Sequence, residues 1–126
     1  MCASDLVLLV EDEPAVREII GTTLEIYGYR VLTASDGAEG LRIFRERADE
    51  IRVVLSDINM PVMSGEVMIR EMRKLKPSIA VIATSGSGPD ANRAMRSIKR
   101  SMQLAKPYTV QELLQALREV ALESSP

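Results

Sequence analysis

Short apolar runs separated by longer stretches of helical periodicity form the pattern of this chain. The runs cover residues 6–10, 30–34, 52–56, 79–83 and 102–105. Runs of this length, rich in β-branched and aliphatic residues and bounded by turn residues, are typical of buried strands. Strands that alternate with helices predict right-handed βαβ units. We therefore expect an α/β fold, doubly wound, with a five-stranded parallel sheet flanked by five helices.

Capping signals place the helices between these runs. We expect helices over residues 14–27, 37–48, 65–75, 90–99 and from 109 onward. Asp36 is suited to cap the second helix, Gly28 ends the first, and Thr109 with Glu112 has the spacing of a capping box. The first helix carries one apolar stripe, and the second has three inward positions. These residues are Val16, Ile19, Ile20, Thr23, Leu24 and Tyr27, then Ala38, Leu41 and Phe44.

Length and composition indicate one globular domain, 1–126, with a core over about 5–123. Hydrophobic residues make up 46% of the chain and charged residues 27%, which is unlike a disordered chain. The formal charge of -2, with acids and bases interleaved, gives no field that would draw nucleic acid or anionic lipid. The lone Cys2 and the lack of a signal peptide or apolar span predict a reducing, cytoplasmic setting without membrane insertion.

The chain contains no histidine. This removes the commonest general base and the usual zinc ligand, and it disfavours zinc enzymes and Ser-His-Asp hydrolases. Carboxylates, hydroxyls and lysine remain for any chemistry, and among metals they favour magnesium, which prefers hard oxygen ligands.

Polar side chains follow several of the predicted strands. Asp57 ends one run, and Glu11 and Asp12 follow another. Two further strand ends carry Thr84 and Ser85, and Lys106. Ligands of open α/β sheets bind beyond the carboxyl ends of the strands, so these groups predict one shared site. Crowded carboxylates repel unless a cation neutralises them, which favours a metal role for Glu11 and Asp12, whereas Glu13 suits a helix entry.

Four motifs occur together in this chain: Val10-Glu11-Asp12-Glu13-Pro14, Asp57-Ile58-Asn59-Met60-Pro61-Val62-Met63-Ser64-Gly65, Ser85-Gly86 and Lys106-Pro107. In this order and spacing, nearly the whole chain resembles a receiver domain of the two-component response-regulator family. The resemblance implies a flavodoxin-like fold with strand order 2-1-3-4-5. It also implies that the domain accepts a phosphoryl group from a partner's phosphohistidine and then switches an output surface.

The resemblance also assigns roles to residues. Asp57 would be the phosphoacceptor, and Ser85 and Lys106 would contact the phosphoryl oxygens, with Thr84 the alternative to Ser85. The ligands of Mg²⁺ (or Mn²⁺) would be Glu11, Asp12, Asp57 and the backbone carbonyl of Asn59. Glu11 is longer than the aspartate frequent at its position, which leaves open whether it binds directly or through water. In typical members the Lys106–Pro107 bond is cis and aims the ammonium into the site.

Partners and output are implied in the same way. A histidine kinase or histidine phosphotransfer protein would donate the phosphoryl group, and a downstream output protein or domain would respond to the phosphorylated receiver. The basic run Arg93, Arg96, Lys99 and Arg100 is either a solvated face or a docking surface. The family's aromatic switch position holds Gln103, and Lys99-Arg100-Ser101 replaces the usual small turn, so an aromatic flip is not expected. The chain is either a stand-alone receiver or the receiver of a hybrid kinase.

Two other functions fit parts of the pattern. A magnesium-dependent phosphatase with an aspartyl nucleophile generally needs a second acid two residues after the nucleophile, but Asn59 occupies that position. A phosphorylation-independent interaction module is the other alternative. Retention of the acids, the hydroxyl and the lysine argues against it.

Overall fold

The computed structural model describes residues 6–60, 62–86 and 101–124, with side chains up to residue 120. In chain order the elements are β1 (Leu6–Val10), α1 (Pro14–Ile26), β2 (Arg30–Ala34), α2 (Gly37–Arg47), β3 (Ile51–Asp57), α3 (Gly65–Leu75), β4 (Ala80–Ser85), β5 (Ser101–Ala105) and α5 (Val110–Ser124). All five predicted strands and four of the predicted helices are present. The helix expected over residues 90–99 lies outside the described residues.

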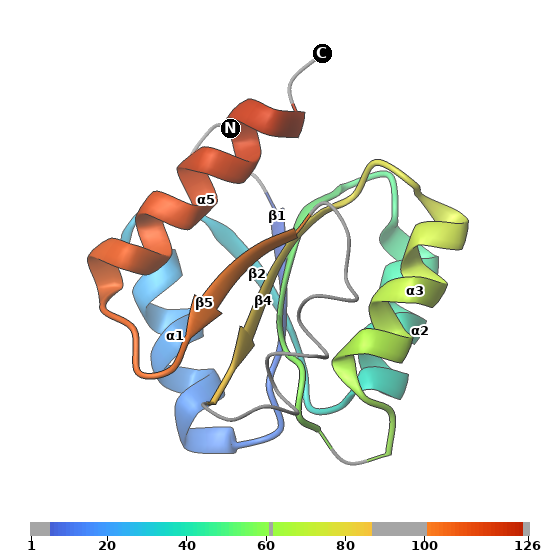
Figure 1. Cartoon of the computed structure of the whole chain (residues 1–126), viewed down its shortest axis with the longest axis horizontal. Coiled ribbons are helices and arrows are strands. Elements are labelled where there is room, and N and C mark those ends of the chain that lie inside the picture. The colour runs from blue at the N-terminus through green and yellow to red at the C-terminus, as the bar shows by residue number, and fades with distance from the viewer. Residues whose placement is uncertain (1–5, 61, 87–100, 125–126) are drawn as a thin grey trace.

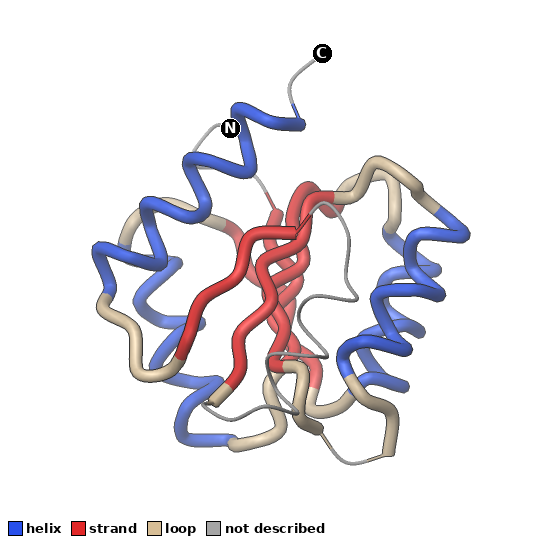
Figure 2. The backbone as a smooth tube through the Cα atoms, in the orientation of Figure 1, coloured by secondary structure: helices blue, strands red, loops and turns tan. Residues whose placement is uncertain are grey.

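The strands form one parallel sheet in the order β2-β1-β3-β4-β5. Helices α1 and α5 cover one face of this sheet and α2 and α3 the other (Figure 1). The strands therefore form the middle layer of three, as the colouring of Figure 2 makes clear. The predicted doubly wound α/β fold and its strand order are confirmed. The strand order reverses between β1 and β3, the place where such sheets bind ligands.

Two apolar clusters, one on each face of the sheet, form the core. Phe44, Met68 and Met72 fill the layer under α2 and α3. Leu24 and Leu117 lie in the layer under α1 and α5. Every residue of β1 is buried, because a parallel central strand is covered on both faces. Aliphatic side chains thus cover both faces of the sheet, and the loops project from its ends.

Side-chain caps fix where the helices begin. The Glu39 N–H donates to Asp36 Oδ1 at 2.8 Å, and the Val67 N–H donates to Ser64 Oγ at 3.3 Å. Before α5, Thr109 and Glu112 exchange two hydrogen bonds of 3.0 and 3.1 Å, which confirms the predicted capping box.

The burial of two helices differs from the prediction. Of the stripe predicted for the first helix, only Leu24 is fully buried, whereas Ile19 is 67% exposed and Tyr27, just after α1, is 52% exposed. On α2 the expected inward residue Ala38 is exposed, and Gly37 and Gly40 are buried instead. A Cβ atom at Gly37 would lie 2.5 Å from the Met63 carbonyl oxygen. The absence of a side chain at Gly37 therefore lets the start of α2 pack closely against the loop after β3.

Candidate functional site

Strand register brings the predicted polar groups to one edge of the sheet. Val10 lies opposite Ser56, so the two residues that follow β1, Glu11 and Asp12, emerge beside Asp57. On the other side of β3, Asp57 lies opposite Thr84. Parallel strands end at the same edge, and three separate parts of the chain therefore meet there.

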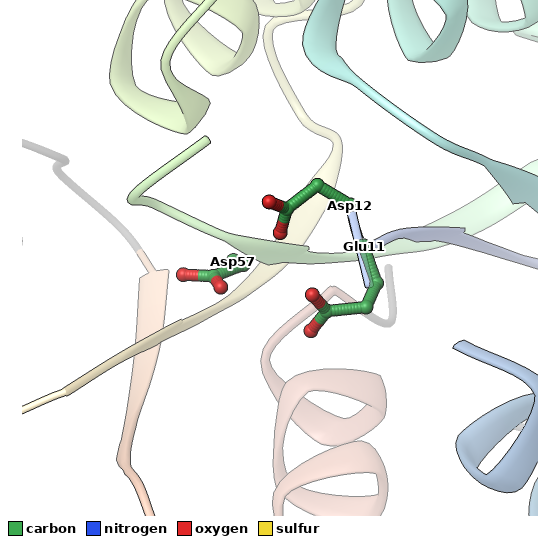
Figure 3. Close-up of side chains that lie close together, drawn as sticks. All are labelled: Glu11, Asp12 and Asp57. Carbon is green, nitrogen blue, oxygen red and sulfur yellow. The ribbon is translucent and has the colours of Figure 1, made fainter. Parts of the chain in front are cut away.

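Three carboxylates lie together at this edge (Figure 3). Glu11, Asp12 and Asp57 each offer an oxygen atom, and these atoms all lie within 4.8 Å of one another. Glu11 and Asp57 are buried, with 3% and 8% of their surface exposed. Oxygen atoms at this spacing match the hard, anionic ligands that Mg²⁺ and Ca²⁺ prefer.

Lys106 reaches the same cluster from the end of β5. Its Nζ lies 2.8 Å from Asp57 Oδ2 and 3.5 Å from Glu11 Oε1. Its backbone N–H donates to the Ser85 carbonyl at 2.8 Å, which continues the pairing of β4 with β5. The Lys106–Pro107 peptide bond is cis, as the resemblance implied. The lysine thus joins the acids of two other strands.

Burial and charge act in opposite directions on this cluster. Burial raises the pKa of the Glu11 carboxyl, and the carboxylates of Asp12 and Asp57 add to that effect, while Lys106 opposes it. For Lys106, burial alone would lower the pKa. The hydrogen bond and negative charge of Asp57, together with Glu11, outweigh burial and raise the pKa of the lysine. The acids are therefore crowded, and the ammonium is held in its charged form.

The turn after Asp57 is held by backbone contacts. The Asn59 N–H donates to Asp57 Oδ1 at 3.0 Å, and the Gly65 N–H donates to the Ile58 carbonyl at 2.9 Å. A side chain at Gly65 would lie 2.5 Å from the Asp57 carbonyl oxygen. Only glycine allows α3 to begin this close to the carboxylate-bearing strand, so this turn orients Asp57.

The two hydroxyl candidates end β4 side by side. The Thr84 hydroxyl donates to the Ser56 carbonyl at 3.5 Å, and the Ser85 hydroxyl donates to the Gly86 carbonyl at 3.2 Å. Both residues are buried. Neighbouring strand residues point to opposite faces, and the two hydroxyls therefore differ in what they can reach.

Two features of the site were not expected from the sequence. Arg17 Nη1 donates to the Glu11 carbonyl at 2.8 Å, a side-chain-to-backbone contact that no sequence spacing reveals. An open groove of about 610 Å³ also lies beside Lys106, between α1 and the segment that leads into α5. Its lining includes Val16, Ile19, Ile20, Tyr108, Val110 and Leu113, together with the charged residues Glu13 and Lys106. The exposed apolar side of α1 borders this groove.

Residues 7–118 match the family described as the response regulator receiver domain. The chain belongs to this family. Receiver domains of two-component response regulators and sensor kinases act as signalling switches, and at family level the phosphoacceptor role is supported. In this receiver domain, Glu11, Asp12, Asp57 and Lys106 lie together at one edge of the sheet.

Relatives of this receiver domain include larger proteins. It is 38% identical to the sensor kinase CckA of Brucella abortus (strain 2308) over 121 residues, which are 95% of this chain and 13% of that protein. It is also 38% identical to the transcriptional regulatory protein GlrR of Escherichia coli (strain K12), over 94% of this chain and 27% of that protein. The chain therefore spans less than a third of either relative.

Solved structures agree with the fold. A response regulator receiver domain protein from Clostridium thermocellum is 38% identical, with a TM-score of 0.87, over 94% of this chain and 95% of that one. The receiver domain from the hybrid histidine kinase CckA is 29% identical, with a TM-score of 0.77, over 91% and 97% of the two chains. Among the described residues, no helix has the length and apolar character needed to cross a membrane.

Proposed function

We propose that this receiver domain takes a phosphoryl group from a partner's phosphohistidine onto Asp57, with Mg²⁺ (or Mn²⁺), and then switches an output surface. The observation that carries the proposal is the gathering of Glu11, Asp12 and Asp57 within 4.8 Å, together with the 2.8 Å contact between Lys106 and Asp57. A lone strand-end acid would have no such surroundings. The proposal treats residues 1–126 as a single receiver domain with its core over about 5–123.

Asp57 supplies the nucleophile of the transfer. One carboxylate oxygen attacks phosphorus in line as the phosphorus–nitrogen bond to the partner's imidazole breaks, and the imidazole keeps the electron pair and takes up a proton. The product is an acyl phosphate on Asp57. Lys106 already contacts this carboxylate and places a fixed positive charge where the incoming oxygens bring negative charge.

The donor set fits a hard dication. Glu11, Asp12 and Asp57, with the backbone carbonyl of Asn59, would hold it, and it would neutralise the carboxylates and the phosphoryl oxygens. Burial is the main cause of the raised pKa of the Glu11 carboxyl, and Asp12 and Asp57 add to it, so a dication among these oxygen atoms would favour the charged form that burial disfavours.

Ser85 is proposed to hydrogen-bond a phosphoryl oxygen, with Lys106 as its charged counterpart. The backbone bond from Lys106 to the Ser85 carbonyl supports this role because it ties the two residues together. Thr84 is the matched control, since it is one residue away and equally buried. We expect Ser85→Ala to slow phosphorylation more than Thr84→Val does, measured as the rate of label incorporation. The reverse order would assign the role to Thr84.

The donor is proposed to be a histidine kinase or a histidine phosphotransfer protein, and the output a downstream protein or domain. The relatives support this reading, since one is named a sensor kinase and another a transcriptional regulatory protein. The proposal includes no direct nucleic-acid contact by this domain. It places the exchange in the cytoplasm.

Incubation with radiolabelled acetyl phosphate, with and without Mg²⁺, tests the proposal. We expect one acid-stable, base-labile phosphoryl group per chain, dependent on Mg²⁺ and absent in Asp57→Ala. Asp12→Ala should lose labelling while Glu13→Ala keeps it, because the Glu13 side chain is exposed and lies outside the cluster. Labelling that persists in Asp57→Ala would contradict the proposal.

The same assay separates the rival functions. Repeated release of phosphate from many monoesters would indicate an aspartyl phosphatase. Asn59 argues against that reading, because its amide cannot act as the general acid. A complete lack of labelling would indicate an interaction module that works without phosphorylation.

A further inference from the structure

Arg17 occupies a place that the helix itself does not favour. It lies in the first turn of α1, which begins at Pro14, and its side chain is half-buried. The N-terminal end of a helix carries partial positive charge, so a cation there is unfavourable by up to about 1 kcal/mol. The guanidinium must therefore gain something from a contact outside the helix. That contact is the 2.8 Å hydrogen bond from Nη1 to the Glu11 carbonyl oxygen.

This hydrogen bond fixes the backbone from which two carboxylates project. Arg17 holds the Glu11 carbonyl, and the Glu11 N–H donates to the Ala34 carbonyl at 3.0 Å. The peptide groups on both sides of the Glu11 side chain are thus anchored, one to β2 and one to α1. Asp12 follows directly, so the orientation of its side chain depends on the same anchored carbonyl.

Glu13 connects the start of α1 to Glu11 by further hydrogen bonds. Glu13, the residue before the helix, makes no side-chain capping bond. Its N–H donates instead to Glu11 Oε2 at 3.2 Å, and its carbonyl accepts from the Arg17 N–H at 2.9 Å. Arg17 therefore contacts the segment through both its backbone and its side chain.

We propose that Arg17 is a positioning residue for the cation site: it touches no reacting group and sets the geometry of Glu11 and Asp12 through their shared backbone. This inference rests on the proposed function, because it assumes that these acids bind a dication. Outer-shell hydrogen bonds of this kind typically change metal affinity by about 10- to 100-fold when they are removed.

When the guanidinium is removed, the loss of its charge and the loss of its positioning contact should change the affinity for Mg²⁺ in opposite directions. In Arg17→Met a positive charge near the acids is lost, and Coulomb's law alone would tighten Mg²⁺ binding. If Arg17 positions the ligands, Mg²⁺ binding weakens instead, by about ten-fold. Isothermal titration calorimetry with MgCl₂ on the unphosphorylated chain measures the sign. Arg118→Met removes the same charge from the exposed surface of α5 and should leave the affinity unchanged.

A conservative variant adds a second readout. Arg17→Lys keeps the charge and a donor on a long side chain, and we expect it to restore most of the lost affinity. Arg17→Gln, which is neutral and too short to reach the carbonyl, should behave as Arg17→Met and replaces it if the methionine variant does not fold. Far-UV circular dichroism and thermal unfolding monitor folding.

Each outcome decides the inference. Unchanged or tighter Mg²⁺ binding in Arg17→Met or Arg17→Gln overturns it, and so does a failure of all three variants to fold. If the unchanged chain itself binds no Mg²⁺, the metal-dependent function fails first, and the positioning role fails with it. If the unchanged chain binds Mg²⁺ and the variants bind it equally well, the positioning role of Arg17 is rejected while the metal-dependent function stands.

Discussion

Lys106 shows how one side chain can stabilise an arrangement that would otherwise repel itself. Its ammonium contacts Asp57 at 2.8 Å and Glu11 at 3.5 Å, and a third of its side chain is exposed. Burial at the strand end removes water from the acids and destabilises their charged forms, and the lysine offsets part of this effect. Both a lysine and a dication can therefore neutralise this cluster, and their effects on stability should overlap.

Lys106→Met should destabilise the domain most when no divalent cation is present. We expect a loss of about 1–2 kcal/mol in the free energy of unfolding in chelator, reduced from the value for buried pairs because the lysine is partly solvated. The loss should shrink at millimolar Mg²⁺, since a ligand that binds only the folded state adds stability. Urea unfolding in EDTA and in MgCl₂ measures both values.

The control for this prediction is Lys74→Met on α3. Lys74 pairs with Glu71 on the surface with 67% of its side chain exposed, so its loss should cost less than about 0.5 kcal/mol in either buffer. If Lys106→Met lost the same free energy of unfolding in both buffers, the lysine and the dication would not be neutralising the same acids.

Sequence patterns located the acids and the lysine because each of these residues directly follows an apolar run. Asp57 and Lys106 lie where strands end, and parallel strands place their ends together. The contact of Arg17 with the Glu11 carbonyl had no comparable signal. A side chain that binds a backbone oxygen selects no particular partner residue, so only coordinates reveal the bond.

At the scale of single elements, strands and helix caps were more predictable than buried faces. Asp36 and Thr109 cap their helices as expected, since capping depends on a few neighbouring residues. The apolar stripe of α1 was a weaker guide: Leu24 is buried and Ile19 is not. Periodicity tells which residues share a helix face, but the neighbouring elements decide how much of that face is covered.

Glycines within or at the start of helices give a prediction at this scale. Gly21 lies inside α1, where an added Cβ would be 3.9 Å from Leu9 and Thr33, an ordinary contact. Gly21→Ala should therefore raise the free energy of unfolding by about 0.5–1 kcal/mol, because alanine favours the helix. Thermal or urea unfolding of the two chains measures the change.

The matched change at the start of α3 should have the opposite sign. An added Cβ at Gly65 would lie 2.5 Å from the Asp57 carbonyl oxygen and 2.8 Å from Ile58 Cα, both of them backbone atoms. We expect Gly65→Ala to lower the free energy of unfolding by about 1–3 kcal/mol and to slow labelling from acetyl phosphate. Equal stabilities for the two alanine variants would show that the turn after Asp57 can move to accommodate a Cβ atom at Gly65.

At the scale of the whole molecule, a groove lies beside Lys106, which contacts the acids of the site. It runs between α1 and the start of α5, and it joins the exposed Ile19 to Lys106. A partner that delivers a phosphoryl group to Asp57 must come close to this edge of the sheet. An apolar surface beside a charged site is suited to hold such a partner while the transfer proceeds.

Ile19→Glu should slow transfer from a phosphorylated histidine kinase about ten-fold while leaving labelling by acetyl phosphate unchanged, because only the protein donor needs the groove. Ile26→Glu is the control: Ile26 belongs to the same helix and is 76% exposed, but it does not line the groove. Rates of label transfer from the kinase measure the effect. Equal slowing by both variants would exclude a specific role for the groove.

The lysine of the site follows β5, which among the described strands pairs with β4 alone and forms an edge of the sheet. Glu11 and Asp57 precede Lys106 in the chain, so a fragment that lacks β5 carries the acids without their ammonium. The charge balance of the site therefore depends on β5 joining the sheet.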